Sequence, residues 1–187
     1  MNKRIQQAEV LLQQKKVNPN KIIKLLKPLI NKRNTPWKAY QISGVAYFIK
    51  NEFAKAEEFF SRSIEAGSKS AEVCYLTGRC RHMMNDHEKA TEYLRRAVEM
   101  NRDYYAAWMM LGDVQREAGD LNEALRSYAQ CNRIDPTKSD VAMKTGEIYR
   151  DQAFSEKALE MFNIVLKMEP NNILALNEKA KLLKNKQ

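Results

Sequence analysis

Three side chains of types that often bind metals lie close together in the sequence: Cys80, His82 and His87. A zinc site needs its ligands on one side of the fold, so that their donor atoms can converge on the ion. Residues 80 and 82 are two apart, and side chains at that spacing on a helix point to different faces. The spacing therefore argues against a metal site, and the sequence predicts no metal and no cofactor.

The chain has three cysteines, at positions 74, 80 and 131, and no CxxC pair. An odd number without such pairs does not form a disulfide framework. Cys74 and Cys80 would lie about 9 Å apart along one helix, which is too far for a disulfide bond. We expect all three to be buried, reduced thiols, and this predicts a cytoplasmic protein.

Signals of catalysis are equally weak. The neighbouring carboxylates Glu57 and Glu58 are interpreted as a solvated helix face. The six glycines all fit packing or helix-end positions, which leaves no glycine-rich loop to hold a phosphate. The sequence therefore predicts that the protein is not an enzyme.

Composition and hydropathy indicate a folded protein without a membrane span. Of the 187 residues, 44% are hydrophobic and 29% are charged, a balance that is unlike that of disordered chains. The longest apolar run covers residues 104–111, far short of a transmembrane helix. The start of the chain is basic but lacks the continuous apolar stretch of a secretory signal.

Four glycines repeat every 34 residues, and two further features repeat with them. The series are Gly44, Gly78, Gly112 and Gly146, then Ala56, Ala90, Ala124 and Ala158, then Phe60, Leu94, Tyr128 and Phe162. Each unit is predicted to be two helices joined by a short turn. A glycine inside a helix costs about 1 kcal/mol, so it indicates a place where another element passes close by. Such units cannot bury their apolar faces alone and must stack.

Several residues indicate where helices begin and end. The expected N-terminal caps are Asn18, Thr35, Ser70 and Ser139, with Pro19 and Pro36 at first helical positions. Gly67 and Gly119 are expected just after helix ends in a left-handed conformation. Pro28 lies inside an otherwise helical stretch and is expected to kink or shorten it.

The segment from Trp108 to Gly112, followed by Ala124, Tyr128 and Pro136, resembles the tetratricopeptide repeat consensus. The resemblance implies an all-α, right-handed α-solenoid of helix-turn-helix repeats with a C-terminal capping helix. The implied units are a basic, degenerate first repeat at 1–36, repeats at 37–70, 71–104, 105–138 and 139–172, and a capping helix with tail at 173–187. The outer units fit more loosely: Val10, Ile22 and Leu26 would take the glycine, alanine and ring places of the first repeat, and Leu176 and Ala180 would continue the register in the last helix.

In this family the first helices of successive repeats line a concave groove that binds proteins. By that resemblance the groove residues here are Val45, Phe48, Tyr75, Arg79, Met83, Met109, Arg116 and Met143. The first half of the groove is expected to be an exposed apolar strip, which is typical of an interface. In the second half, charges spaced three and four apart, such as Asp113 with Arg116 and Glu147 with Arg150, are expected to pair within each helix.

The net charge of +9 is concentrated at the start of the chain. Residues 1–36 carry a net charge of +8, residues 37–172 a net charge of −2, and the last fifteen residues a net charge of +3. Lys21, Lys24 and Lys27 recur beside apolar residues, as in an amphipathic basic helix. They either form a solvated end unit or bind an anionic partner. A nucleic acid is the least favoured partner, because residues 1–36 contain no aromatic side chain to stack on bases.

Together these features predict a scaffold or adaptor that binds a protein segment or peptide in its concave groove. One alternative is a structural subunit of a larger assembly, possibly a self-associating oligomer, which would use its ends and faces. A weaker alternative is a regulatory piece of a longer enzyme.

Overall fold

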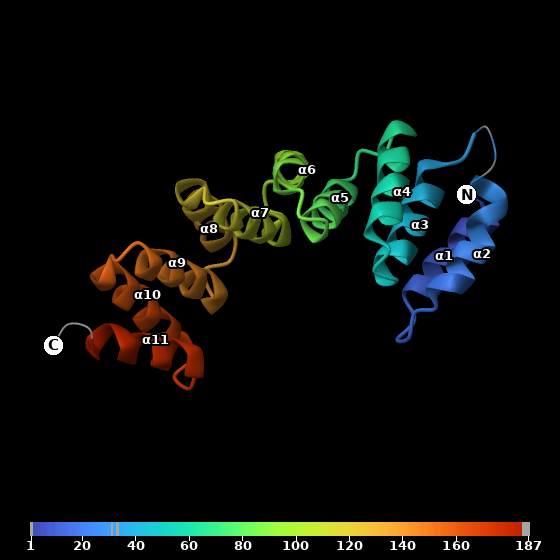
Figure 1. The fold of residues 1–187 in the computed structure, drawn as a ribbon. Helices are drawn as coiled ribbons and strands as arrows, with labels where there is room; N and C mark the ends of the chain where they lie inside the picture. Colours follow the sequence, from blue (N-terminus) through green and yellow to red (C-terminus); the bar gives the residue numbers. More distant parts are fainter. Residues whose placement is uncertain (1, 31, 33, 185–187) are drawn as a thin grey trace. The chain divides into compact units, whose positions relative to one another are not determined.

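The computed structural model describes residues 2–30, 32 and 34–184, and within them the chain forms eleven helices and no strand (Figure 1). The first six are α1 (Lys3–Leu12), α2 (Pro19–Ile30), α3 (Trp37–Ile49), α4 (Phe53–Glu65), α5 (Ala71–Met83) and α6 (His87–Met100). The others are α7 (Tyr105–Glu117), α8 (Leu121–Ile134), α9 (Ser139–Asp151), α10 (Ser155–Met168) and α11 (Ile173–Lys184). The predicted all-α solenoid is confirmed. No helix in the described ranges has both the length and the hydropathy needed to span a bilayer.

The chain divides into two compact units, Met1–Ala107 and Trp108–Gln187. Unit 1 contains α1 to α6 and the first residues of α7, and unit 2 contains the rest of α7 and α8 to α11.

In four helix pairs the repeated glycine of the first helix lies against the repeated ring or leucine of the second. A Cβ added at Gly44 would lie 2.5 Å from the Phe60 ring, and one added at Gly112 would lie 2.4 Å from the Tyr128 ring. The repeated alanines, such as Ala124, are fully buried. There is no room for a side chain at the crossing, which explains why helix interiors keep a residue that lowers helix stability. The expected glycine contacts are confirmed.

A three-residue turn joins the two helices of each of these pairs, and its middle residue is left-handed. These residues are Asn51 (φ 60°), Asn85 (φ 59°), Gly119 (φ 86°) and Ala153 (φ 61°), again 34 residues apart. The next backbone N–H then donates to a carbonyl of the preceding helix, as from Glu52 to Tyr47 at 3.0 Å. Gly67 is also left-handed, as expected (φ 93°).

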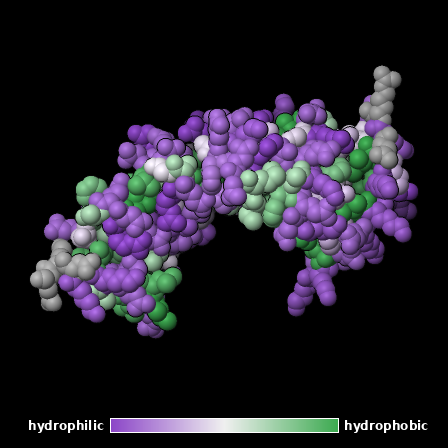
Figure 2. Space-filling model, in the orientation of Figure 1, coloured by the Kyte–Doolittle hydropathy of each residue, from purple (hydrophilic) through white to green (hydrophobic). Residues whose placement is uncertain are grey.

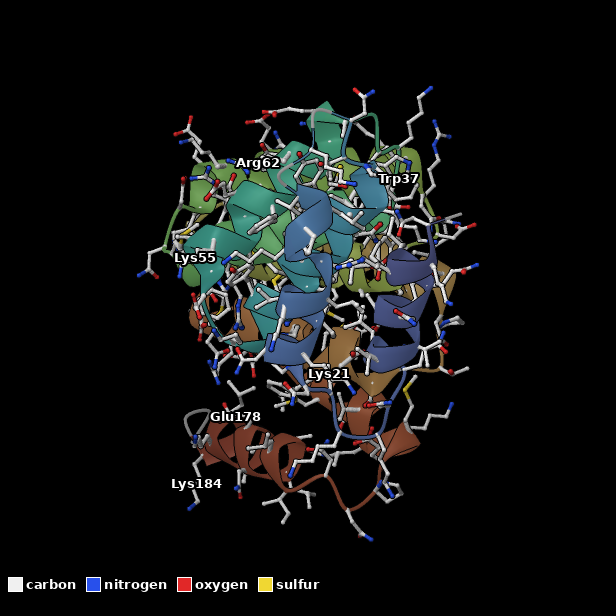
Figure 3. The ribbon with its side chains drawn as sticks, turned by 90° about the vertical axis from the view of Figure 1, so that its right-hand side faces the viewer. Lys21, Trp37, Lys55, Arg62, Glu178 and Lys184 are labelled. Carbon is white, nitrogen blue, oxygen red and sulfur yellow. The ribbon has the colours of Figure 1, made fainter. Side chains whose placement is uncertain are left out.

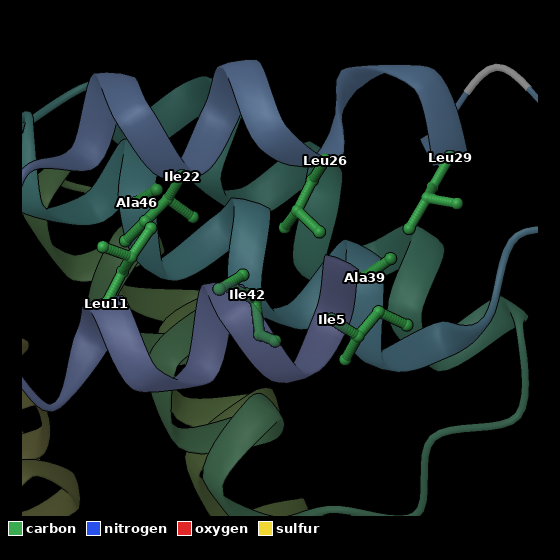
Figure 4. Packing of buried hydrophobic residues seen from close by; sticks show 9 residues of the cluster. Ile5, Leu11, Ile22, Leu26, Leu29, Ala39, Ile42 and Ala46 are labelled. Carbon is green, nitrogen blue, oxygen red and sulfur yellow. The ribbon is translucent and has the colours of Figure 1, made fainter. Parts of the chain in front are cut away.

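The first repeat departs from the predicted register. Val10, expected at the glycine place, is 60% exposed, whereas Ala8 is fully buried. α1 and α2 begin 34 residues before α3 and α4, but α1 ends at Leu12, so six residues, 13–18, connect the two helices where the later turns have three. Ile22 and Leu26 are fully buried as expected, and α2 continues through Pro28 before it ends at Ile30. The resulting core is formed by Ile5, Ala8, Leu11, Ile22, Leu26, Leu29, Ala39, Ile42 and Ala46 (Figure 4).

The helix caps are only partly as predicted. Asn18 accepts a bond from a backbone N–H in the first turn of α2 at 3.1 Å, which confirms that cap. The predicted cap at Thr35 is wrong, because its buried hydroxyl donates to a carbonyl of α2 at 2.7 Å. Ser70 precedes α5 but makes no side-chain cap bond. Ser139 is the first residue of α9, and its hydroxyl bonds to Glu169 across the unit.

Candidate binding groove

A groove of about 550 Å³ opens in unit 1 across the first helices α1, α3 and α5. Its lining includes Leu12 of α1 and Gln13 directly after that helix, Trp37, Lys38, Gln41, Val45 and Ile49 of α3, and Glu72 of α5. Val45 therefore lies where the family resemblance implied. Three successive first helices contribute to one hollow because they occupy the same place in stacked repeats.

The groove combines apolar surface with paired polar groups. Trp37 and Ile49 are 37% and 43% exposed. Lys38 Nζ lies 2.6 Å from a carboxylate oxygen of Glu9, so an ion pair joins α3 to α1. The Gln41 amide donates to the carboxylate of Glu72 at 3.2 Å, which joins α3 to α5. A ligand would therefore meet apolar side chains beside both hydrogen-bond donors and acceptors.

The expected apolar strip is partly covered by a cation. The Arg79 guanidinium lies 4.7 Å from the Phe48 ring centroid and 5.5 Å from that of Tyr75. Phe48 and Tyr75 are half-buried, and each also contacts another ring, Phe53 at 5.5 Å and Tyr104 at 5.1 Å. The prediction that these two rings form bare surface is therefore wrong. Their contacts join α3 to α4 and α5.

Met83 is the predicted groove methionine that lies most open to solvent. Its side chain is 54% exposed at the end of α5, whereas Met109 and Met143 in unit 2 are half-buried. Met143 packs against Ala158 and Phe162 of the hydrophobic core. Core packing thus accounts for the methionine at position 143, but it does not account for the exposed side chain of Met83.

In unit 2 most of these charges pair between helices, so the predicted pairing within each helix is wrong for Asp113 with Arg116 and for Glu147 with Arg150. The pairs are Asp113 with Lys144 at 2.7 Å, Arg116 with Glu147 at 2.5 Å, and Arg150 with Glu178 at 2.6 Å. Arg150 also contacts its neighbour Asp151 at 2.7 Å. Each pair is partly exposed, so its stabilisation is about 0–1 kcal/mol. Together they link α7 to α9 and α9 to α11. The side chain of Arg116 therefore serves to hold two successive repeats together.

The three cysteines and Glu57, whose side chains could take part in catalysis, are held within the packed structure. All three cysteines are buried and free, and burial raises the pKa of the Cys80 and Cys131 thiols to about 12. Such thiols are poor nucleophiles, because the thiolate is the reactive form. Glu57 is not solvated as expected, since its carboxylate accepts a bond from Arg81 of α5 at 2.8 Å.

The predicted basic patch lies on the surface of α2. Lys21, Lys24 and Lys27 are exposed, and Lys21 is seen in Figure 3. Of the four apolar residues between them, Ile22 and Leu26 are fully buried in the core, whereas Ile23 and Leu25 are partly buried. A second hollow, of about 600 Å³, is lined by Lys3, Gln6, Gln7, Val10 and Leu11 of α1 and by Lys21 and Leu25 of α2. That an anionic partner binds there stays a prediction.

Comparisons with known proteins agree with this geometry. Residues 82–148 match a family model described as tetratricopeptide repeat. The chain is 25% identical over 129 residues to BBSome complex member BBS4 of Bos taurus, and 26% identical over 137 residues to anaphase-promoting complex subunit 3 of Schizosaccharomyces pombe. These matches cover 69% and 73% of the chain but only 25% and 21% of the relatives, so the chain spans a quarter or less of their length.

Solved structures show the same architecture. The crystal structure of YrrB, described as a TPR protein with an unusual peptide-binding site, has a TM-score of 0.84 at 26% identity. That match covers 95% of this chain and 90% of YrrB. The crystal structure of MamA has a TM-score of 0.78 at 22% identity and covers 81% of this chain and 89% of MamA.

Proposed function

The chain is a tetratricopeptide repeat protein, and from that premise we propose that it is a non-catalytic adaptor that binds a segment of another protein. The binding surface is the groove of α1, α3 and α5 in unit 1. YrrB, with its peptide-binding site, supports a peptide as the ligand class.

One observation carries this proposal: the groove keeps large apolar side chains open to solvent between paired polar groups. Trp37 and Ile49 would leave water when a ligand covers them, and each buried Å² of apolar surface contributes about 25 cal/mol. On the corresponding face of unit 2, the charged side chains of the first helices are already joined in ion pairs. The groove of α1, α3 and α5, whose apolar side chains are open to solvent, is thus the better candidate for the binding surface.

The groove also indicates the kind of ligand. Its rim carries one cation, Lys38, and two carboxylates, Glu9 and Glu72, so no single ligand charge is strongly favoured. An extended or helical peptide with an apolar side fits this surface, since its side chains would bury Trp37 and Ile49 while its polar groups meet the rim.

Selection from a library of short random peptides on the immobilised protein tests the proposal. Ile49→Asp places a charge in the groove and should abolish capture of the selected peptides. Met168→Asp is the matched control, because Met168 of α10 is 42% exposed, close to the 43% of Ile49. Both variants should keep their helical content by circular dichroism. Equal loss of capture in the two variants, or none in Ile49→Asp, contradicts the groove assignment.

The alternative of a structural subunit also has support. The relatives named above are a member of one complex and a subunit of another. An adaptor groove and assembly contacts can coexist on one repeat array, because they use different faces.

A further inference from the structure

The first helix α5 carries two opposite charges on one of its sides. Glu72 lines the groove of α1, α3 and α5, and Arg79 follows it two helical turns later. Side chains seven residues apart lie on the same face of a helix. A rise of about 1.5 Å per residue places these two about 10 Å apart along the helix axis. The face of α5 therefore has a fixed order of charges, first negative and then positive.

Neutral side chains of α3 hold both charged groups in place. The Gln41 amide donates to the Glu72 carboxylate at 3.2 Å, and the Phe48 ring centroid lies 4.7 Å from the Arg79 guanidinium. Gln41 and Phe48 are also seven residues apart, so the two contacts have the same register between the helices. Within the part of the chain that the structure describes, neither Glu72 nor Arg79 forms an ion pair. The contacts with α3 thus fix the two groups without cancelling their charges.

Neighbouring charges on the first helices are already compensated. Lys38 of the groove pairs with Glu9 at 2.6 Å. In unit 2 the place of Arg79 is taken by Asp113 and Glu147, and both belong to ion pairs. A group that is already held in place loses little further freedom when a ligand binds it. The two charges of α5, which are held but not compensated, are therefore the ones that a ligand is expected to pair with.

Apolar side chains lie beside these two charges. Tyr75, between them on α5, is half-buried, and its ring centroid lies 5.5 Å from the Arg79 guanidinium. One turn beyond Arg79, Met83 is 54% exposed, and a methionine suits an adaptable apolar contact. On the face of unit 1 seen in Figure 2, patches of hydrophobic surface lie among hydrophilic side chains. A ligand that pairs with the charges would therefore also bury apolar surface.

We propose that α5 selects extended peptides with a basic and an acidic side chain three residues apart, the basic one paired with Glu72 and the acidic one with Arg79. This inference rests on the proposed function and names the ligand class of that groove. An extended chain rises about 3.3 Å per residue, so three residues span the distance between the two charges. The guanidinium suits the acidic side chain, because its planar edge can donate two parallel hydrogen bonds to a carboxylate.

Four libraries of short synthetic peptides test this selection. Two central positions, three residues apart, are fixed as Lys and Glu, as Glu and Lys, as two Lys or as two Glu, and the other positions are randomised. Acetylated and amidated ends remove the terminal charges. The immobilised protein should capture peptides from the two mixed libraries at least about tenfold more than from the two like-charged libraries.

A captured peptide from a mixed library then tests the order of the charges. Exchanging its Lys and Glu should weaken binding at least about tenfold in fluorescence anisotropy, because like charges then meet at both places. The protein variant Glu72→Lys with Arg79→Glu should restore binding of the exchanged peptide. Glu58→Lys with Arg62→Glu is the matched control, since it exchanges two exposed charges that pair at 2.8 Å on α4. This control should bind both peptides as the unchanged protein does.

A single neutral substitution supports the same test if the double variant loses helical content by circular dichroism. Arg79→Gln should weaken binding of the captured peptide, but it should not weaken binding of the same peptide with its Glu replaced by Gln. Equal weakening of the two peptides would mean that Arg79 does not recognise the acidic side chain, and this overturns the proposal.

The outcomes separate this inference from the proposed function. Equal capture from all four libraries, or stronger capture from a like-charged library, overturns the selection of paired charges. So does an exchanged peptide whose binding the folded Glu72→Lys with Arg79→Glu variant does not restore. If Ile49→Asp still abolishes capture in these cases, the groove and the adaptor function stand. No capture from any library overturns both proposals.

Discussion

Replacing Ala153 by glycine should stabilise the protein, which is unusual for an alanine-to-glycine change. Ala153 is the middle residue of the turn between α9 and α10, with φ at 61°. Its N–H donates to Arg150 at 2.9 Å, and the N–H of Phe154 donates to Tyr149 at 2.8 Å, so the turn is held in this conformation. The equivalent places in the other turns hold asparagine or glycine, residues that adopt left-handed backbone more readily.

The expected gain follows from two opposing terms. A left-handed conformation costs an alanine about 1–2 kcal/mol more than it costs a glycine. Glycine in turn adds about 0.4–1 kcal/mol of chain entropy to the unfolded state. The difference between the two ranges gives a net stabilisation by Ala153→Gly of about 0–1.6 kcal/mol, with about 0.8 kcal/mol at its middle. Ala129→Gly, at an exposed position inside α8, has no strain to relieve and should cost about 1 kcal/mol.

Urea unfolding in a Trp37→Phe background measures both effects. The two tryptophans of the chain lie in different units, so this background leaves Trp108 as a fluorescence reporter within unit 2, where both alanines lie. The unfolding midpoint should rise for Ala153→Gly and fall for Ala129→Gly. A fall of similar size in both variants would refute the assignment of a strained turn at residue 153.

Three further changes test the packing, the acid sensitivity and the basic surface. Tyr128→Phe removes the bond that the phenol donates to Asp113 at 2.7 Å and should cost about 1 kcal/mol in urea unfolding, and an unchanged midpoint would mean that the bond adds nothing. The bonds from Lys181 and from an arginine of α9 lower the pKa of Glu178 below its ordinary 4.5, so their stabilisation is present above that pH and is lost as pH falls through the lowered pKa. Glu178→Gln should flatten this acid dependence, whereas an identical pH profile would show that another carboxylate controls it. If the three exposed lysines of α2 bind an anionic partner, changing them to glutamine should weaken binding to anionic vesicles or RNA, as should raising salt to about 0.5 M, and salt-insensitive binding would contradict this.

The sequence predicted the fold because the glycine, alanine and ring places describe contacts inside one hairpin. Those contacts depend only on spacing along the chain, so the crossing of Gly112 with Tyr128 follows from the period alone. The same reasoning was wrong at Val10 of the first repeat, which is 60% exposed. There α1 ends at Leu12 and six residues connect it to α2, and this early end gives no signal in a glycine pattern. The left-handed turn at Ala153 was also missed, since alanine gives no signal of that conformation.

The site was harder to predict, because its side chains meet between repeats. Arg116 has a carboxylate available on its own helix, and the sequence reasoning paired it there. The structure pairs it with Glu147 of the next first helix instead. Which of two acceptable partners an arginine takes depends on the stacking of successive helices, and that geometry has no counterpart in residue spacing on one helix.

One pair of register places shows how the two units have diverged. In unit 2 these places hold Arg116 and Glu147, which form an ion pair between successive first helices. In unit 1 they hold Phe48 and Arg79, which form a cation–π contact at 4.7 Å. Both contacts join neighbouring repeats, but a guanidinium over a ring leaves apolar surface around it, whereas an ion pair leaves charge. Because the hairpin interior fixes the fold through glycine, alanine and ring, the first-helix face is free to change in this way. The cation–π contact of Phe48 with Arg79 lies beside the groove of α1, α3 and α5. This is a physical reason to expect ligand binding in unit 1 and contacts that hold the repeats together in unit 2.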